Sequence, residues 1–242
     1  MSTHRVGVEV TRRHTEAAVL APDGTLLSRR EADRSDIPSV VALIGECTEL
    51  AGELNVGIAA DGDFPREELE RALGRPIRLA PRAACLALSE GNDGSAVADE
   101  VVFAAILGAT ATGGLSVRGR VRGGDHQLDP SLANAGFCDG LSITVPEVML
   151  RVRFADAVAV AAFERYLERL VRALVEITET YSPTVIVLGG TIGRLDDLYT
   201  PLAQALEHSL HRGASRPAVQ KAAHGESSVI RGAAALWPIN AG

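Results

Sequence analysis

Apolar positions in the first hundred residues recur with two different spacings. Residues 5–10 alternate apolar and polar side chains, which predicts a β-strand. The turn signal Pro22-Asp23-Gly24 separates two further strands and indicates a hairpin. Apolar residues every three to four positions over 36–53 predict an amphipathic helix that packs on this sheet. The elements predicted for this half are strands at 5–10, 16–21, 25–30 and 56–60 and helices at 36–53, 65–73 and 81–90.

The second half of the chain repeats this order of elements. Residues 156–181 form one long predicted helix with a single apolar face. The other predicted elements are a strand at 101–107, a hairpin at 113–117 and 120–122, a strand at 184–190 and helices at 194–210 and 226–237. Strands followed by a helix, repeated twice, are typical of a duplicated α/β lobe. We therefore expect two lobes, joined near residues 90–100 and again near the end of the long helix.

Composition and charge narrow the possible functions. The 242 residues are 46% hydrophobic with a formal net charge of -7, so the chain is globular and lacks the basic surface that nucleic acid requires. Cys47, Cys85 and Cys138 lie far apart, which argues against a zinc or redox motif and favours a reducing cytoplasm. The absence of a long uncharged apolar run argues against a membrane. The Ala, Arg and Gly content is typical of a GC-rich bacterial genome.

Four segments carry a family resemblance, and they occur in family order across nearly the whole chain. They are RVGVEVTRRHTEAAVLAPDGTLLSRR, VVFAAILGATATGGLSVRGRVRGG, TVIVLGGTIGRLDDLY and SSVIRGAAALW. Together they resemble the first phosphate loop, second phosphate loop, adenosine segment and final helix of the ROK (repressor, ORF, kinase) family. A Gly-Asp-Phe-Pro turn at 62–65 stands where that family has a G-x-P-G loop.

The resemblance implies an α/β chain with the actin-like ATPase (ribonuclease H-like) fold, in two lobes with mixed sheets flanked by helices. The expected lobes are residues 1–95 and 96–242, the second with a helical insert shortened to about 141–181. The resemblance also implies a sugar kinase-like protein for which ATP and Mg are possible ligands, and it favours a homodimer.

The position of the family's catalytic base carries a residue of the wrong chemistry. The family has an Asp in an Asn-Asp motif that opens the helix after the first lobe's last strand. Here Pro81 and Arg82 stand in those places. An arginine keeps its proton and cannot be that base. It could hold a carboxylate or phosphate, although a surface or salt-bridging role is favoured.

The phosphate loops are altered as well. The family's D-x-G-G-T-K becomes residues 9–14, where Glu9 keeps a carboxylate at the metal-facing position. Thr11 and Arg12 replace two glycines and block the close backbone approach. Arg12 and Arg13 could bind an anion, but a solvated hairpin tip is favoured. The residues that could still contact a phosphate or nucleotide are Glu9, Thr11, Gly108, Thr110, Thr112, Gly113, Gly114, Gly189, Gly190 and Thr191. The glycines have an alternative interpretation as tight strand ends.

The sugar-binding motif E-x-G-H and the following cysteine cluster are missing. His126 precedes the expected position, Asp129 is a loose substitute for the Glu, and Cys138 is a single cysteine that cannot hold zinc. His126 with Asp125 and Asp129 could form a metal group, but a polar loop is favoured, so no metal site is predicted.

Two functions remain open. The first is a pseudokinase that uses the fold for binding or assembly, with a small anionic or nucleotide ligand in its cleft. The second is an active ATP-dependent kinase of a sugar-like metabolite, whose base has moved to Asp61, Asp63 or Asp129. A transcriptional regulator is disfavoured because no helix-turn-helix precedes Arg5.

Overall fold

The first lobe is built on a mixed five-stranded sheet. The computed structural model describes residues 4–51 and 55–237. The strands of this sheet are β1 (Arg5–Val10), β2 (Thr15–Leu20), β3 (Leu26–Ala32), β4 (Asn55–Ala60) and β5 (Arg78–Ala80). They lie in the order β3-β2-β1-β4-β5, with β1 to β3 antiparallel and β4 and β5 parallel to β1. Apolar side chains of α1 (Ile37–Ala51) and α2 (Arg66–Leu73) pack with the sheet in one core.

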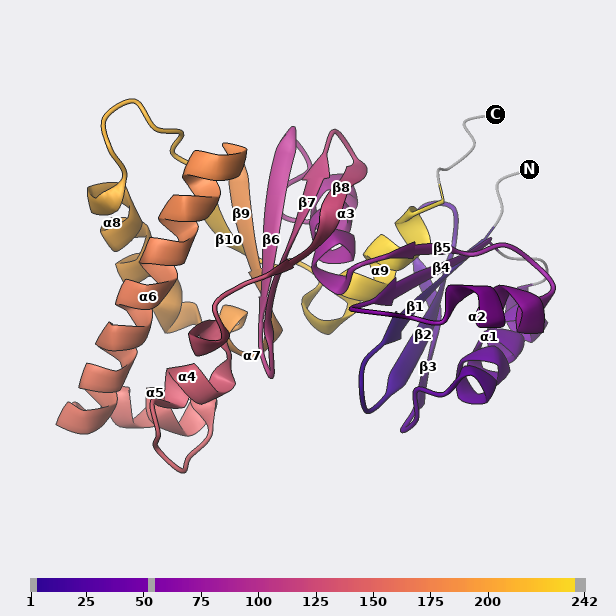
Figure 1. The fold of residues 1–242 in the computed structure, drawn as a ribbon, viewed down its shortest axis with the longest axis horizontal. Coiled ribbons are helices and arrows are strands. Elements are labelled where there is room, and N and C mark those ends of the chain that lie inside the picture. The colour runs from indigo at the N-terminus through magenta and orange to yellow at the C-terminus, as the bar shows by residue number, and fades with distance from the viewer. Residues whose placement is uncertain (1–3, 52–54, 238–242) are drawn as a thin grey trace.

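The second lobe repeats the topology of the first. Its strands are β6 (Val101–Leu107), β7 (Ala111–Val117), β8 (Arg120–Gln127), β9 (Val185–Gly189) and β10 (Ala218–Lys221). Their order is β10-β9-β6-β7-β8, again three antiparallel strands followed by two parallel ones. Figure 1 shows the two sheets one after the other along the long axis of the molecule. The predicted duplication is therefore confirmed.

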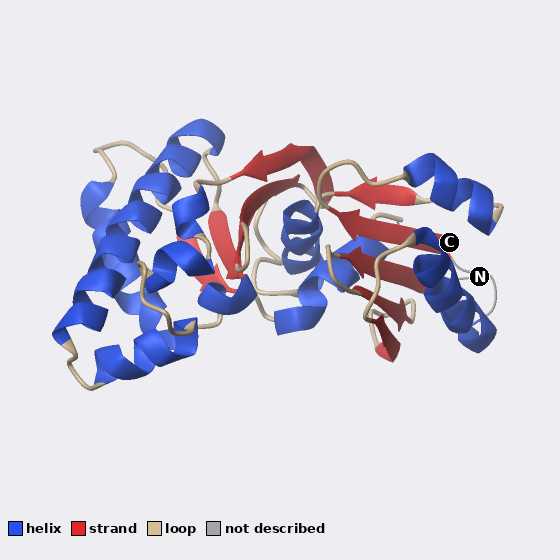
Figure 2. Cartoon of the chain, turned by 60° about the horizontal axis from the view of Figure 1, so that its bottom comes forward, coloured by secondary structure: helices blue, strands red, loops and turns tan. Residues whose placement is uncertain are grey.

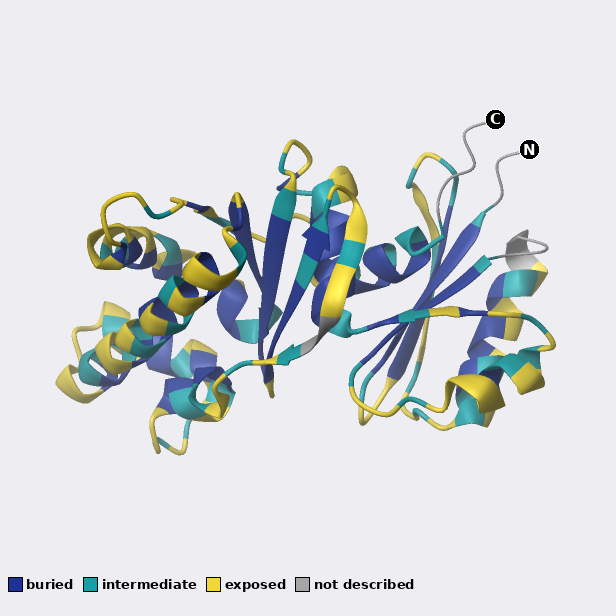
Figure 3. Ribbon diagram, turned by 45° about the horizontal axis from the view of Figure 1, so that its top comes forward, coloured by how far each residue is buried: buried dark blue, intermediate teal, exposed yellow. Residues whose placement is uncertain are grey.

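The end of the second lobe that lies farthest from the first is helical (Figure 2). Its helices are α4 (Asn134–Cys138), α5 (Val145–Arg153), α6 (Ala157–Tyr181) and α8 (Tyr199–Ser209), whereas the four-residue helix α7 (Gly190–Gly193) directly follows β9. The long predicted helix is confirmed as α6. Its N-cap is Asp156, whose carboxylate accepts hydrogen bonds from the backbone N–H groups of Val158 and Ala159, each at 3.0 Å. The buried strands and the inner faces of these helices form the core, and the outer helix faces are exposed (Figure 3).

Two helices lie between the sheets and cross each other. They are α3 (Arg82–Asp93) and α9 (Ser228–Ala235), and they make the most extensive helix–helix contact of the described residues. By chain order α3 follows the first sheet, but it packs on β6 and β7 of the second. Helix α9 ends the described chain, but it packs on β1 and β4 of the first. Each lobe thus covers one face of its sheet with a helix from the other half of the chain.

Four glycines bring these layers close together. A Cβ atom on Gly7 or on its strand neighbour Gly57 would lie within 1.9 Å of a carbonyl oxygen of α9. A Cβ atom on Gly232 of α9 would lie 1.7 Å from the carbonyl oxygen of Cys85 in α3. A Cβ atom on Gly114 of β7 would lie 2.1 Å from the backbone nitrogen of Ala84. Only glycine permits backbones to approach this closely.

The connections between the lobes are residues 94–100 and 222–227. The second connection lies after β10, so the expectation that it would follow the long helix is wrong. Helix α6 leads instead into β9, which pairs with β6 inside the second sheet. Glu90 of α3 is fully buried and accepts hydrogen bonds from Ser95 N–H at 2.9 Å and from Ala223 N–H at 3.0 Å. The Glu90 carboxylate is therefore hydrogen-bonded to both segments that connect the lobes.

Among the residues that the structure describes, no helix is long and apolar enough to cross a membrane.

Some short elements of the structure were not predicted, among them strands β5 and β10 and helices α4 and α5. The predicted helix at 194–210 is shorter, because residues 196–198 form a separate turn and α8 begins at Tyr199.

We expect Gly232→Ala to lower the free energy of unfolding by about 3 kcal/mol or more, because the methyl group overlaps Cys85 and separates α9 from α3. The matched control is Gly45→Ala in α1, where a Cβ atom meets nothing within 4 Å. There we expect a gain of about 0.5–1 kcal/mol from helix propensity. Urea unfolding of both variants measures the difference, and equal changes would contradict the close crossing.

Candidate functional site

A cleft of about 1060 Å³ is lined by residues from both lobes. From the first lobe come the turn after β1, the loop after β4 and the start of α3. From the second come the turn between β6 and β7, the end of β9 and the start of α9. Of the sequence-predicted residues, the structure brings into this lining Glu9, Thr11, Asp61, Asp63, Arg82, Gly108, Thr110, Thr112, Gly189, Gly190 and Thr191. The lining excludes Gly113, Gly114 and Asp129.

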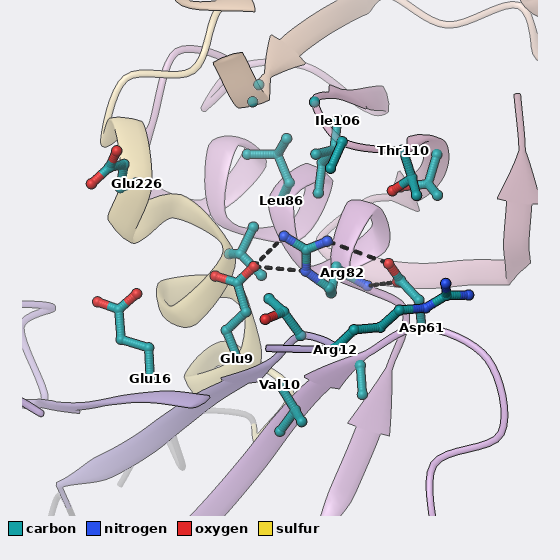
Figure 4. A pocket seen from close by; sticks show the side chains of 18 of the residues that line it. Glu9, Val10, Arg12, Glu16, Asp61, Arg82, Leu86, Ile106, Thr110 and Glu226 are labelled. Atoms are coloured by element: carbon teal, nitrogen blue, oxygen red, sulfur yellow. Dashed lines mark hydrogen bonds and ion pairs between the residues drawn. The ribbon is translucent and has the colours of Figure 1, made fainter. Parts of the chain in front are cut away.

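Arg82 lies on the floor of the cleft between two carboxylates (Figure 4). Its Nε donates to Glu9 Oε1 at 2.7 Å, and its Nη2 is 2.5 Å from the same oxygen. On the other side its Nη1 is 3.5 Å from Asp61 Oδ2. The backbone N–H of Arg82, at the first residue of α3, donates to Asp61 Oδ1 at 2.9 Å. Asp61 thus satisfies a free N–H at the positive end of the helix dipole.

The guanidinium of Arg82 is permanently charged in this setting. Burial alone would lower the pKa of Arg82, but the nearby carboxylates of Glu9 and Asp61 outweigh that effect, and the net pKa is raised. The Arg82 side chain is 20% exposed and the Glu9 side chain 8% exposed. The expected salt-bridging role of Arg82 is therefore realised inside the cleft rather than on an outer surface.

A magnesium ion does not fit the residues on this floor. Magnesium favours carboxylate and water oxygens in octahedral geometry. Here the carboxylates of Glu9 and Asp61 already have a cation between them. Residues 4–51 and 55–237 contain no group of three or more His, Cys, Asp or Glu side chains arranged to hold a metal.

The first loop, between β1 and β2, is closed by its own hydrogen bonds. Thr11 Oγ1 accepts from His14 N–H at 3.1 Å and donates to His14 O at 2.9 Å. The side chains of Arg12 and Arg13 are exposed, and both residues line the cleft. The Arg12 side chain extends toward Asp61 (Figure 4). Neither guanidinium has an ion-pair partner within the described ranges, so both could receive an anion.

The second loop is only partly a ligand surface. Thr112 is 2% exposed, and its Oγ1 is buried with no hydrogen-bond partner among the described residues. A Cβ atom on Gly108 would lie 4.0 Å from its nearest neighbour, so packing does not require glycine there. By contrast, a Cβ atom on Gly113 would lie 2.5 Å from the Phe103 ring. Gly113 and Gly114 therefore have structural roles within β7.

The end of β9 has a structural explanation too. Gly190 has φ 78°, and a Cβ atom there would lie 2.5 Å from the carbonyl oxygen of Leu107. A Cβ atom on Gly189 would lie 2.7 Å from Leu86. Glycine is required at these two positions because the end of β9 packs closely against β6 and α3. The helix that follows, α7, has four residues.

Comparisons with known proteins place the chain in a family. The model of the ROK family matches residues 132–239. The chain is 30% identical over 231 residues to the N-acetyl-D-glucosamine kinase of Mannheimia succiniciproducens, a match that covers 78% of this chain and 76% of the relative. It is 31% identical to the N-acetyl-D-glucosamine kinase of Erwinia tasmaniensis over 218 residues, 74% of this chain and 72% of the relative. The chain belongs to the ROK family.

Solved structures show the fold of this ROK protein. The ROK hexokinase of Thermus thermophilus superposes with a TM-score of 0.84 at 20% identity, over 97% of each chain. The ROK glucokinase of Streptomyces griseus, solved with glucose and AMPPNP, superposes with a TM-score of 0.72 at 19% identity, over 96% of this chain and 98% of that one. The predicted actin-like ATPase fold is confirmed.

The residues predicted for the sugar side of this ROK protein lie outside the cleft lining. His126 Nδ1 and Tyr181 Oη are 3.2 Å apart, and both rings pack with Phe103. Asp129 accepts from Ser131 N–H at 2.8 Å, and this hydrogen bond lowers the pKa of Asp129, which makes it a weaker base. The side chain of Asp125 lies outside the described part, and Cys138 is buried in α4.

Sequence reasoning missed several charged residues of the cleft. Arg194 forms an ion pair with Glu226, and Arg29 forms one with Glu16. Lys221, on the unpredicted strand β10, donates to the carbonyl oxygen of Arg194 at 3.0 Å. No motif marks these residues, because the partners of each contact lie 13 to 32 positions apart in the sequence.

We expect Arg82→Met to lower the free energy of unfolding by about 2–4 kcal/mol, because it leaves the Glu9 carboxylate without its partner in a largely buried place. The double variant Glu9→Gln/Arg82→Met removes that unpaired charge and should be more stable than Arg82→Met alone.

Arg118→Met is the control for that comparison. It breaks an exposed pair with Glu100 and should change the stability by less than about 0.5 kcal/mol. Urea unfolding at constant pH measures all three variants. A double variant less stable than Arg82→Met would contradict the ion-pair interpretation.

Proposed function

We propose that this ROK protein is a sugar kinase-like protein that has lost phosphotransfer activity and uses its cleft to bind a small anionic ligand or a nucleotide. The observation that carries the proposal is the ion-paired guanidinium of Arg82, which lies between Glu9 and Asp61 at the family's base position. A group that is always protonated cannot accept the proton of a sugar hydroxyl.

The groups around Arg82 do not compensate for the missing base. The carboxylates of Glu9 and Asp61 both contact the guanidinium, so neither is free to ligate a metal. Phosphoryl transfer depends on positioning and on a metal that neutralises the developing charge of the phosphates. The cleft supplies neither a free carboxylate at the floor nor a fit for that metal.

The alternative of a relocated base has less support. Asp61 lines the cleft but has two hydrogen-bonding or ionic contacts with Arg82. Asp129 caps a turn outside the lining, where its pKa is lowered. Asp63 lines the cleft and is exposed, so it is the remaining candidate.

The binding role is supported by groups without a partner inside the described structure. The guanidinium groups of Arg12 and Arg13 have no ion pair, and the buried hydroxyl of Thr112 has no hydrogen bond. Charged donors and a hydroxyl around a cleft suit the oxygens of a phosphate or carboxylate. Relatives are named N-acetyl-D-glucosamine kinase, so this sugar and ATP are the first ligands to test.

Turnover is the direct test of lost activity. With ATP, Mg²⁺ and N-acetylglucosamine or common hexoses, we expect no detectable ADP release in a coupled assay. Loss of positioned proton transfer alone costs about 10²–10⁴ in rate. Arg82→Asp should not restore turnover, because Thr11 and Arg12 still replace the loop glycines. A rate near the typical ~10 s⁻¹ of enzymes would refute the proposal, and Asp63→Asn would then test the relocated base.

Ligand binding is tested separately by calorimetry with ATP. We expect Arg12→Met/Arg13→Met to weaken binding at least about tenfold, because losing even one charge-assisted hydrogen bond costs on the order of 1.5–3 kcal/mol. Arg118→Met, whose residue lies outside the cleft lining, should bind ATP as the parent does. Equal affinities in all three proteins would contradict a role for the first loop.

A further inference from the structure

Three neighbouring strand and helix ends place a cation between two carboxylates. Glu9 is near the end of β1, Asp61 directly follows β4, and Arg82 opens α3 just after β5. These strands are adjacent and parallel, so their carboxyl ends lie at the same edge of the sheet. The two carboxylates bind opposite sides of the guanidinium (Figure 4).

We infer that the guanidinium of Arg82 is an internal counter-cation that excludes divalent metal ions from the Glu9 and Asp61 carboxylates, so that ligands bind in this cleft without a metal. Removing the positive charge converts the carboxylate pair into a divalent-cation site. The inference concerns the cleft of the proposed function, but it does not depend on whether the cleft turns over a sugar.

Loss of the positive charge of Arg82 would leave the carboxylates of Glu9 and Asp61 without a cation between them. Two carboxylates would then lie near each other on the cleft floor, and one of them, Glu9, is only 8% exposed. Asp61 would keep the hydrogen bond from the backbone N–H at position 82, so it would stay in place. Like charges in a partly buried site repel each other unless a cation binds between them. A pair of carboxylates completed by water is a normal ligand set for a small divalent ion.

The guanidinium of Arg82 is held in place and stays charged, so it would exclude divalent metal ions under all physiological conditions. The Arg82 Nε and Nη2 atoms both face Glu9 Oε1, so the guanidinium is held by a fork of donors rather than by one contact. The raised pKa of Arg82 keeps the group charged at every physiological pH. A lysine at this position would supply the same charge from a single nitrogen.

The experiment titrates Mn²⁺ into metal-free protein and follows bound ion by electron paramagnetic resonance. Four full-length proteins are compared: the parent, Arg82→Met, Arg82→Lys and Glu9→Gln/Arg82→Met. Met and Lys have similar length and differ in charge, which makes them a matched pair. Circular dichroism shows whether each variant is folded before the titration.

We expect Arg82→Met to bind one Mn²⁺ at least about tenfold more tightly than the parent, because the site changes from one net negative charge to two. Arg82→Lys should resemble the parent, and Glu9→Gln/Arg82→Met should lose the gained binding. Tight one-to-one binding by the parent would overturn the inference. Folded Arg82→Met that binds no better than Arg82→Lys would also overturn it.

If Arg82→Met does not fold, Arg82→Gln takes its place in the same comparison, and the parent titration still decides whether the carboxylates accept a metal. The outcome is separate from the turnover assay. Turnover by the parent without Mn²⁺ binding at the carboxylates would refute the lost activity and leave the metal exclusion intact. Tight Mn²⁺ binding by the parent without turnover would refute the metal exclusion and leave the proposed loss of activity intact.

Discussion

The crossing of α3 and α9 between the sheets is the constraint on which the rest of the structure depends. The first sheet, α9, α3 and the second sheet are packed in that order. They approach closely because no side chain stands at four positions, which are Gly7, Gly57, Gly232 and Gly114. The contact fixes the start of α3 against both lobes, and Arg82 is the first residue of that helix. The position of the cleft floor is therefore set in part by these close backbone contacts of α3 and α9.

Arg82 links this architecture to the chemistry of the cleft. The same residue offers its backbone N–H to Asp61 and its side chain to Glu9 and Asp61, so the helix start, the end of β1 and the loop after β4 form one unit. Glu9 is the most buried of these side chains, so its carboxylate depends most on the guanidinium as its partner. Arg82 therefore joins the start of α3 to the sheet of the first lobe.

Much of the fold could be predicted because it depends on local patterns. Apolar spacing located β1, α6 and β9, and the repeated order of elements indicated the duplicated lobes. Short edge elements such as β5 and β10 have three and four residues, too few for periodicity to mark them. A salt-bridging role of Arg82 was expected, but its partners could not be predicted, because Glu9 lies 73 positions away in the sequence. The family resemblance assigns Arg82 to the base position, whereas only the fold shows what that residue contacts.

The exchange of α3 and α9 between lobes has a consequence for any attempt to divide the protein. A fragment that ends near residue 95 would carry α3 without the second sheet on which it packs, and its own sheet would lack α9 over Gly7 and Gly57. The complementary fragment would expose the surface left by α3. Neither half has a complete core by itself, so the lobes are a topological repeat but not two autonomous folding units. Co-expressed halves would be driven to associate by the apolar surfaces that each lacks.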